Sequence, residues 1–473
     1  MRRFFKKGVW VYMADKKKKV RESLAQTTVR NALDKGDIYT RMSAILMGSG
    51  NFARGQICKG IIYLLAEISF LFFLFTHGVA YLKGLTTLGI QETGETFNEK
   101  KQIYEYTAGD NSMLFLFYGI LTLFIIAGFI LIWRTAVKSA FEAQCCKAMG
   151  KKAPGIRADI HQLFDKKLYG SLLFFPVLCV VAFTIMPLVF MFCMAFTNYD
   201  RNHQPPGTLF DWVGIANFQK LFDVNGGLGY AFWHVLGWTI VWAILATALN
   251  YIFGMILAII INRKETRIKG FWRFVFVLSI AVPQFVSLLI MRTMLQEQGA
   301  INVLLQNLGL ISGPLPFWTN TMWARVTVII INLWVGIPFT MLQVTGILQN
   351  IPQELYEAAK VDGANVIVTF FKITLPYMLF VTAPYLITQF IGNINNFNVI
   401  YLLTEGKPAT MNYFNGTAGK TDLLVTWLYK LTVDFKDYNY AAVIGIAVFV
   451  LSAIFSLAAY RRTGAYKDEE GFQ

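Results

Sequence analysis

Eight long apolar runs dominate this 473-residue sequence and restrict what it can fold into. A bilayer core about 30 Å thick is crossed by a helix of about 20 apolar residues, and in lipid only helices and closed barrels satisfy their backbone hydrogen bonds. The runs are Ile61–Leu82, Met113–Trp133, Leu168–Ala195, Phe232–Ile261, Val275–Met294, Val326–Leu348, Leu375–Leu403 and Tyr440–Ala459. With 55% hydrophobic and 15% charged residues, the composition also excludes a water-soluble globule. We therefore expect an all-α polytopic integral membrane protein with eight transmembrane helices.

The basic residues indicate how these helices are oriented. The net charge is +15, and the loops on the side of the N terminus hold 32 Lys and Arg residues against 11 in the other loops. Because cytoplasmic loops retain Lys and Arg, both termini are predicted to be cytoplasmic in a multi-pass protein of the cell membrane. The charge is scattered over loops rather than gathered on one module, which argues against nucleic acid as a partner.

The loops between the runs suggest how the chain is organised. We expect a basic cytoplasmic segment over 1–59, in which the charged run 15–22 is a solvated arm and no cleaved signal peptide is present. Two transmembrane helices and a cytoplasmic linker follow over 60–168, then the main transmembrane domain over 169–460 and a cytoplasmic tail over 461–473. The external segment 196–231 is too short for a domain of its own and is expected to form a packed cap.

The sequence lacks the residue patterns of an enzyme or a metal site. Its five cysteines lack disulfide or zinc spacing, and its four histidines stand far apart, so we expect free thiols and no bound metal. Gly419-Lys420-Thr421 resembles the end of a phosphate loop, but the glycine required five positions before Gly419 is Phe414. The chain is therefore predicted not to be an enzyme and to bind no cofactor.

Ionisable side chains are scarce inside the predicted spans. Glu67, Arg292 and His234 are the main exceptions, and we expect Glu67 to pair with a neighbouring helix and Arg292 to reach the membrane surface. Carriers driven by an ion gradient usually use such groups in mid-membrane and have two related halves. The alternative of an ion-coupled secondary sugar carrier therefore has little support in the sequence.

A short helix is predicted in the cytoplasmic loop 350–376. Pro352 suits the first helical position, Glu354 favours the positive end of the helix, and Gly363 can close the helix in a left-handed conformation. One face is predicted to carry a leucine, two alanines and an aspartate at helical spacing, with a glutamate at its edge, which suits contact with another protein. These residues are Leu355, Ala358, Ala359, Asp362 and Glu357.

This loop resembles the EAA loop of permease subunits in ATP-binding-cassette (ABC) importers. The resemblance rests on Glu357-Ala358-Ala359, three residues, Gly363, nine residues, and then Ile373-x-Leu375-Pro376. In that family the loop couples the permease to a separate ATPase. The resemblance assigns this role to Glu357, Ala358, Ala359, Asp362 and Gly363, and it implies the type I ABC importer permease fold.

The resemblance extends to both sides of the loop. Asn332-Leu333-Trp334-Val335-Gly336-Ile337-Pro338, Asn395-Asn396-Phe397 and Leu402-Leu403-Thr404 are similar to the larger permease subunit of maltose/maltodextrin transporters, over about 326–460. The enterobacterial form of that subunit has a large external domain between its third and fourth spans, where this chain has only 196–231. Contacts with a binding protein at that domain therefore do not carry over.

Two polar helical faces are candidates for contact with a substrate. The sixth span carries Asn332, Val335, Gly336 and Phe339 on one face, and the seventh carries Gln389, Gly392, Asn393 and Asn396. At 1.5 Å per residue, both faces reach the middle of the bilayer. Amides, an aromatic ring and glycines suit a neutral sugar, although amides that bridge helices and glycines that allow close packing are a second interpretation.

In the maltose family the positions that match these eight residues line the sugar site. Phe339 stands where that family has tyrosine, and Gln389 and Gly392 replace a serine and a phenylalanine of the enterobacterial form. The resemblance thus implies a permease for neutral oligosaccharides, with maltose or maltodextrin expected first. It also implies four kinds of partner: a second permease subunit, an ABC ATPase dimer that binds ATP and Mg, an extracellular sugar-binding lipoprotein and the oligosaccharide itself.

Overall fold

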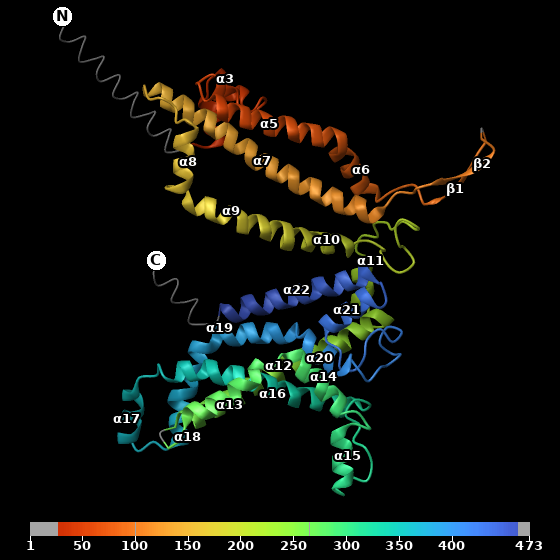
Figure 1. Cartoon of the computed structure of the whole chain (residues 1–473), viewed down its shortest axis with the longest axis vertical. Coiled ribbons are helices and arrows are strands. Elements are labelled where there is room, and N and C mark those ends of the chain that lie inside the picture. Colours follow the sequence, from red (N-terminus) through yellow and green to blue (C-terminus); the bar gives the residue numbers. More distant parts are fainter. Residues whose placement is uncertain (1–26, 100, 264, 462–473) are drawn as a thin grey trace, which may run out of the picture. The chain divides into compact units, whose positions relative to one another are not determined.

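The computed structural model describes residues 27–99, 101–263 and 265–461, and most of this part of the chain is helical (Figure 1). Seven helices within it are long and apolar enough to cross a membrane. They are Ile57–Thr87, Ser112–Ala148, Leu168–Met194, Gly227–Asn262, Thr321–Leu348, Val366–Thr404 and Tyr438–Tyr460. Each contains one of the predicted spans or covers most of it, which confirms the polytopic helical fold. The charged run 15–22 lies outside the described residues.

The fifth predicted span is broken, so the expectation of one continuous helix over Val275–Met294 was wrong. Helices α13 (Lys269–Ala281) and α14 (Gln284–Met294) meet at an angle of 84°. Pro283 has no backbone N–H to donate, and its ring forces Val282 out of the helical conformation, to φ −76° and ψ 125°. The pair is a bent span or a re-entrant segment.

The described chain forms two compact units. Unit 1 comprises the residues up to Cys193 together with Asn202–Trp212, and unit 2 comprises Met194–Arg201 together with the residues from Val213 onward. The segment 196–231, which the sequence suggested to be one packed cap, is thus shared between the two units. In unit 2 its helix α11 (Ala216–Phe222) is tied to the preceding chain, because the Asn217 amide donates to the carbonyls of Ala195 and Thr197 at 2.9 and 2.7 Å.

Unit 1 is built on three long helical segments. The elements in chain order are α2 (Val29–Lys35), α3 (Ile38–Met42), α4 (Ser49–Phe52), α5 (Ile57–Phe73), η1 (Leu74–Gly78), α6 (Val79–Thr87), β1 (Gly94–Asn98), β2 (Ile103–Thr107), α7 (Ser112–Ala148), α8 (Ile156–Phe164), α9 (Leu168–Val180), η2 (Val181–Ile185) and α10 (Met186–Met194). The antiparallel ribbon of β1 and β2 extends beyond the ends of α6 and α7 (Figure 1). The Glu67 carboxylate on α5 accepts a hydrogen bond from the backbone N–H of Met47 at 2.7 Å, so its partner is a loop rather than a transmembrane helix.

Unit 2 contains the remaining helices, both the long membrane-spanning ones and the shorter ones between them. Besides α11, α13 and α14, they are α12 (Gly227–Asn262), α15 (Ala300–Asn307), α16 (Thr321–Leu348), α17 (Gln353–Val361), α18 (Val366–Thr369), η3 (Phe370–Thr374), α19 (Leu375–Ile394), α20 (Phe397–Thr404), α21 (Leu424–Val433) and α22 (Tyr438–Tyr460). Helix α12 packs along both α16 and α19. It is therefore the central helix of this unit.

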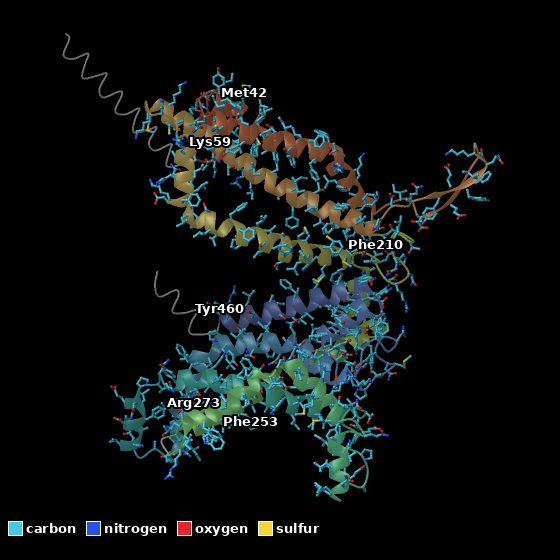
Figure 2. The ribbon with its side chains drawn as sticks, viewed as in Figure 1. Met42, Lys59, Phe210, Phe253, Arg273 and Tyr460 are labelled. Atoms are coloured by element: carbon cyan, nitrogen blue, oxygen red, sulfur yellow. The ribbon has the colours of Figure 1, made fainter. Side chains whose placement is uncertain are left out.

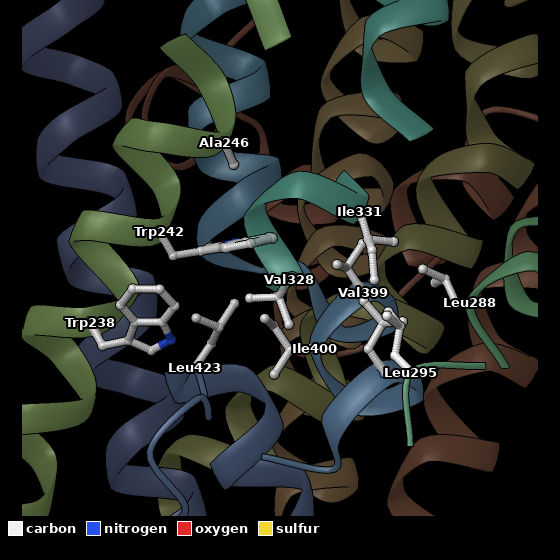
Figure 3. Close-up of a cluster of buried hydrophobic side chains, with 11 residues drawn as sticks. Trp238, Trp242, Ala246, Leu288, Leu295, Val328, Ile331, Val399, Ile400 and Leu423 are labelled. Atoms are coloured by element: carbon white, nitrogen blue, oxygen red, sulfur yellow. The ribbon is translucent and has the colours of Figure 1, made fainter. Parts of the chain in front are cut away.

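A buried apolar cluster holds the first half of α12 against α16 and α20 (Figure 3). Trp238, Trp242 and Ala246 of α12 contact valine, isoleucine and leucine side chains from the other helices. These are Leu288, Leu295, Val328, Ile331, Val399, Ile400, Leu403 and Leu423. Both tryptophans also satisfy their indole N–H groups, Trp238 at the Thr421 carbonyl at 3.1 Å and Trp242 at the Asn393 carbonyl at 3.1 Å.

Two glycines allow α12 and α16 to approach closely. A Cβ atom on Gly254 of α12 would lie 2.6 Å from the Cβ of Thr340, and one on Gly336 of α16 would lie 2.3 Å from the Asn250 amide nitrogen. Real Cβ atoms essentially never come this close to other heavy atoms. In a membrane, where lipid is as apolar as the side chains, such close packing of small residues is a main source of helix association.

We expect Gly254→Val to lower the free energy of unfolding by about 1–3 kcal/mol, because the new side chain overlaps Thr340 and pushes α12 away from α16. The measurement is thermal unfolding of the purified protein in detergent. Gly237→Val is the matched control on the same helix, since a Cβ there meets no atom within 4 Å. Equal losses for the two variants would contradict the close-contact interpretation.

Candidate functional site

Polar side chains on α12 meet two residues of α19 inside the membrane region. The Asn393 amide donates to the Thr247 hydroxyl at 2.9 Å, and the Tyr251 hydroxyl lies 2.8 Å from that of Thr382. Asn393 is only 7% exposed, and its backbone carbonyl accepts from Trp242. Asn393 therefore joins two helices in this chain, whatever else it contacts.

Asn332 on α16 is 4% exposed and lies one turn before Gly336, which contacts Asn250 of α12. The Nδ2 atom of Asn332 has no hydrogen-bond partner among the described residues, and neither does the Oδ1 atom of Asn250 on α12. The Asn250 amide lies against Gly336. Unpartnered buried polar atoms are rare and costly. This stretch of the interface is therefore a candidate for function as well as packing.

The other predicted sugar contacts lie in different surroundings. Phe339 is 53% exposed, and Gln389 and Gly392 are also exposed. Val335 packs against the cluster of Figure 3, and the Asn396 side chain caps α20 by accepting from the backbone N–H of Val399 at 3.2 Å.

The structure thus divides the eight predicted residues. Gly336 and Asn393 contact α12, and Asn332 is buried. Val335 and Asn396 support helix packing, and Phe339, Gln389 and Gly392 are exposed.

The polar residues of α12 itself were not among the predicted site residues. Thr247, Asn250 and Tyr251 follow the helical spacing i, i+3 and i+4 within the apolar run Phe232–Ile261. They provide the partners of Asn393 and Thr382 and the neighbour of Gly336. Their spacing was the available signal, because polar residues at i, i+3 and i+4 share one face of a helix.

The predicted loop helix is present as α17, one residue later than proposed, with Pro352 just before its first residue, Gln353. Its end is a Schellman motif: Gly363 has φ +72°, its N–H donates to the Lys360 carbonyl at 3.1 Å, and the Ala364 N–H donates to the Ala359 carbonyl at 2.9 Å. This positive φ is the conformation that glycine adopts without strain. The end of α17 is therefore fixed by its own backbone.

The two faces of α17 differ in exposure. Ala359 is 8% exposed on the side toward the bundle, where the Tyr356 hydroxyl lies 3.0 Å from that of Thr374. The opposite face leaves Leu355, Glu357, Ala358 and Asp362 exposed. Of the predicted coupling residues, Ala359 thus contacts this chain's own bundle, and Glu357, Ala358, Asp362 and Gly363 are accessible to a partner.

At the other end of unit 2, a buried carboxylate organises the loop between α20 and α21. Asp422 accepts from the Gly419 N–H and the Lys430 ammonium, both at 2.7 Å, and from the Thr426 hydroxyl at 2.8 Å. Burial raises the pKa of Asp422, although Lys430 acts in the opposite direction. Nearby, the hydrogen bond from Arg292 at 2.8 Å lowers the pKa of Glu405.

This loop contains the Gly419-Lys420-Thr421 sequence. The Thr421 hydroxyl donates to the Lys407 carbonyl at 2.7 Å, so it acts within the loop, as expected for a chance match to a phosphate-binding motif. In the part of the chain that the structure describes, no three His, Cys, Asp or Glu side chains are placed to hold a metal ion.

Comparison with known proteins identifies the family. Residues 250–462 match the model of the family described as binding-protein-dependent transport system inner membrane component. The galactooligosaccharide transport permease GanP of Bacillus subtilis is 35% identical over 430 residues, which cover 90% of this chain and 97% of that protein. The maltodextrin transport permease MdxF of the same organism is 34% identical over 435 residues, covering 90% and 96%.

A solved structure supports the same fold. The crystal structure of a bacterial ABC transporter involved in the import of alginate contains a chain that aligns with a TM-score of 0.50 at 23% identity, over 64% of this chain and 97% of that one. The relatives named above are permease subunits of sugar transport systems, and they match nearly the whole of this sequence. The chain therefore belongs to the binding-protein-dependent transport family, as a larger sugar-permease subunit of an ABC importer in the cell membrane.

Proposed function

We propose that this chain forms half of the translocation pathway for an oligosaccharide and is driven by a separate ATPase that binds α17. The observation that carries the proposal is the geometry of α17: a short helix with a fixed end, supported by the bundle on one face and exposed on the other. A rigid helix of this kind transmits a push from a partner to the transmembrane helices that flank it, α16 and α18–α19.

The charge distribution supports a cytoplasmic location for α17. Helix α17 lies at the same end of unit 2 as Arg273, which is near the start of α13 (Figures 1 and 2). The loops on that side belong to the set that holds 32 of the 43 basic residues. Cytoplasmic loops retain Lys and Arg. We accordingly place α17 and both termini inside the cell and the loop between α20 and α21 outside it.

The remaining parts of the importer come from partners. This chain offers one α17 loop, so a second permease subunit is needed to engage the other half of an ABC ATPase dimer, which supplies the ATP and Mg chemistry. An extracellular sugar-binding lipoprotein delivers the substrate. The names of GanP and MdxF support an oligosaccharide as cargo, and we take maltodextrin as the first sugar to test.

The open surface around Phe339, Gln389 and Gly392 is where we place the sugar in mid-membrane. An exposed aromatic ring stacks on the apolar face of a sugar ring, and the amide of Gln389 can donate to and accept from its hydroxyls. Buried nearby along α16 and α12, Asn332 Nδ2 and Asn250 Oδ1 have no hydrogen-bond partner among the described residues. Neutral groups of this kind suit neutral sugar rings.

We expect Gly363→Trp to weaken association with the ATPase about tenfold or more, corresponding to about 1.4 kcal/mol, because a bulky residue at φ +72° strains the end of α17. The measurements are co-purification with the ATPase and sugar-stimulated ATP hydrolysis. Gly309→Trp is the matched control, since Gly309 has φ +70° and open space around it but lies in the loop after α15. Normal coupling in Gly363→Trp would refute the proposed role of α17.

We expect Phe339→Ala to raise the KM for maltodextrin uptake about threefold to tenfold, through loss of about 0.7–1.4 kcal/mol of stacking energy, without changing thermal stability. Phe449→Ala is the control, because Phe449 on α22 is 54% exposed against 53% for Phe339. Uptake into proteoliposomes that contain the complete transporter gives the KM. An unchanged KM in Phe339→Ala would place the sugar elsewhere.

We expect Asn393→Ala to behave differently from Phe339→Ala. The substitution removes the hydrogen bond to Thr247 between α19 and α12 and should lower the free energy of unfolding by about 1–2 kcal/mol. If Asn393 also contacts sugar, uptake falls further than the loss of folded protein explains. Thermal unfolding and uptake per folded complex separate the two roles, and a variant that is normal in both would contradict them.

A further inference from the structure

A cavity of about 770 Å³ opens in unit 2 between the first half of α12, the first turns of α16 and the loop that joins α20 to α21. Its volume falls within the range of small-molecule sites. Among the lining residues are three aromatic rings and three basic or imidazole groups: Trp233, His234, Trp238, Arg325, Tyr413 and Lys420. None of them belongs to the predicted sugar site or to α17.

Two cations in this cavity rest on aromatic rings. The Arg325 guanidinium lies 4.3 Å from the centre of the Trp238 ring, and the Lys420 ammonium lies 4.0 Å from that of Tyr413. Among the described residues, neither cation forms an ion pair with a carboxylate. The cavity therefore carries two positive charges that no acidic side chain balances.

The two cations have different roles in the loop. Arg325 donates from Nε and Nη2 to the Lys420 carbonyl at 3.1 and 3.0 Å, so it holds the loop against α16. The Lys420 ammonium has only the face of Tyr413 as its contact in the described chain, and its three N–H donors remain available to a ligand. Among the described residues, the Lys420 ammonium thus forms no hydrogen bond that holds the loop in place, whereas the Arg325 guanidinium does.

His234 adds a group of the opposite kind. Its Nδ1 atom lies 2.8 Å from the Tyr230 carbonyl, and because a carbonyl oxygen can only accept, Nδ1 carries the hydrogen. In that tautomer Nε2 is the ring atom that can accept a hydrogen bond. Together with the face of Trp233, which is 43% exposed, the cavity offers an aromatic surface, strong donors and one acceptor.

The cavity lies in line with the mid-membrane residues. Arg325 in the cavity wall precedes Asn332 by seven residues, and Ile329 precedes Gly336 by seven. All four residues therefore fall on one face of α16, and the two members of each pair are about 10 Å apart along the helix axis. Further along both helices from the cavity, the contacts at Gly336 and Gly254 bring α12 and α16 together. In the orientation proposed above, the cavity is at the external end of the interface between α12 and α16.

We propose that this cavity is an outer saccharide subsite that prefers a ring bearing a carboxylate. The inference rests on the proposed function, oligosaccharide import, and it extends the substrate class from neutral chains to chains with one acidic ring. The ring stacks on Trp233, and its carboxylate accepts charge-assisted hydrogen bonds from Lys420 and from Nη1 of Arg325.

The test uses two ligands that differ in one group: maltotriose, and maltotriose whose non-reducing ring carries a carboxylate in place of the hydroxymethyl group. Binding to the complete transporter in nanodiscs of zwitterionic lipid is followed by tryptophan fluorescence at low and physiological salt. We expect the acidic ligand to bind about tenfold more tightly, less so at higher salt. Lys420→Met, which keeps an unbranched side chain over Tyr413, should abolish this preference and leave maltotriose binding unchanged.

Lys407→Met is the matched control, because Lys407 lies in the same loop, is exposed and does not line this cavity. Equal binding of the two ligands by the unmodified transporter, or an undiminished preference in Lys420→Met, would overturn the proposal. Loss of acidic-ligand binding in nanodiscs that contain phosphatidylglycerol would also overturn it, by identifying a lipid headgroup as the occupant. ATP-driven maltotriose uptake, measured in parallel, tests the proposed function separately.

Discussion

The close contact of α12 with α16 and α19 is the constraint on which unit 2 depends. Because lipid gives helices no hydrophobic reason to associate, the interface has to be made from close packing and hydrogen bonds. Gly254 and Gly336 provide the close approach to α16, and Thr247 and Tyr251 provide the hydrogen bonds to α19. Along the axis of α12, these four residues lie within about two helical turns of each other, near the middle of the bundle.

That constraint explains why the candidate sugar residues do not share one environment. Asn332 and Asn393 are buried in the helix packing, whereas Phe339 on α16 and Gln389 and Gly392 on α19 are exposed. The polar layer therefore holds the helices together. A movement of α16 against α12 would change the helix packing and the position of Phe339 at the same time. In the proposed mechanism, a movement of α17 would alter sugar binding through this shift of α16.

The features that could be predicted from the sequence are those set by local chemistry. Run length located the spans, and Gly363 marked the end of α17 because its left-handed conformation depends only on the adjacent backbone. Other features depend on residues far apart in the chain. The division of the polar faces by α12 could not be predicted without knowing which helix packs on α16. The break at Pro283 was missed although the local signal was present, because the apolar run continued through it.

The distribution of charge suggests where such a permease can discriminate between substrates. A cation at the centre of a bilayer is costly, so the mid-membrane surface of Phe339 and Gln389 can recognise only ring faces and hydroxyls. Arg325 and Lys420 lie toward one end of the bundle, where the cost of a charge falls and where aromatic rings support both cations. The carboxylate recognition proposed for the cavity therefore fits this end of the bundle, because a charge there costs less than one beside Phe339 and Gln389 in the middle of the membrane.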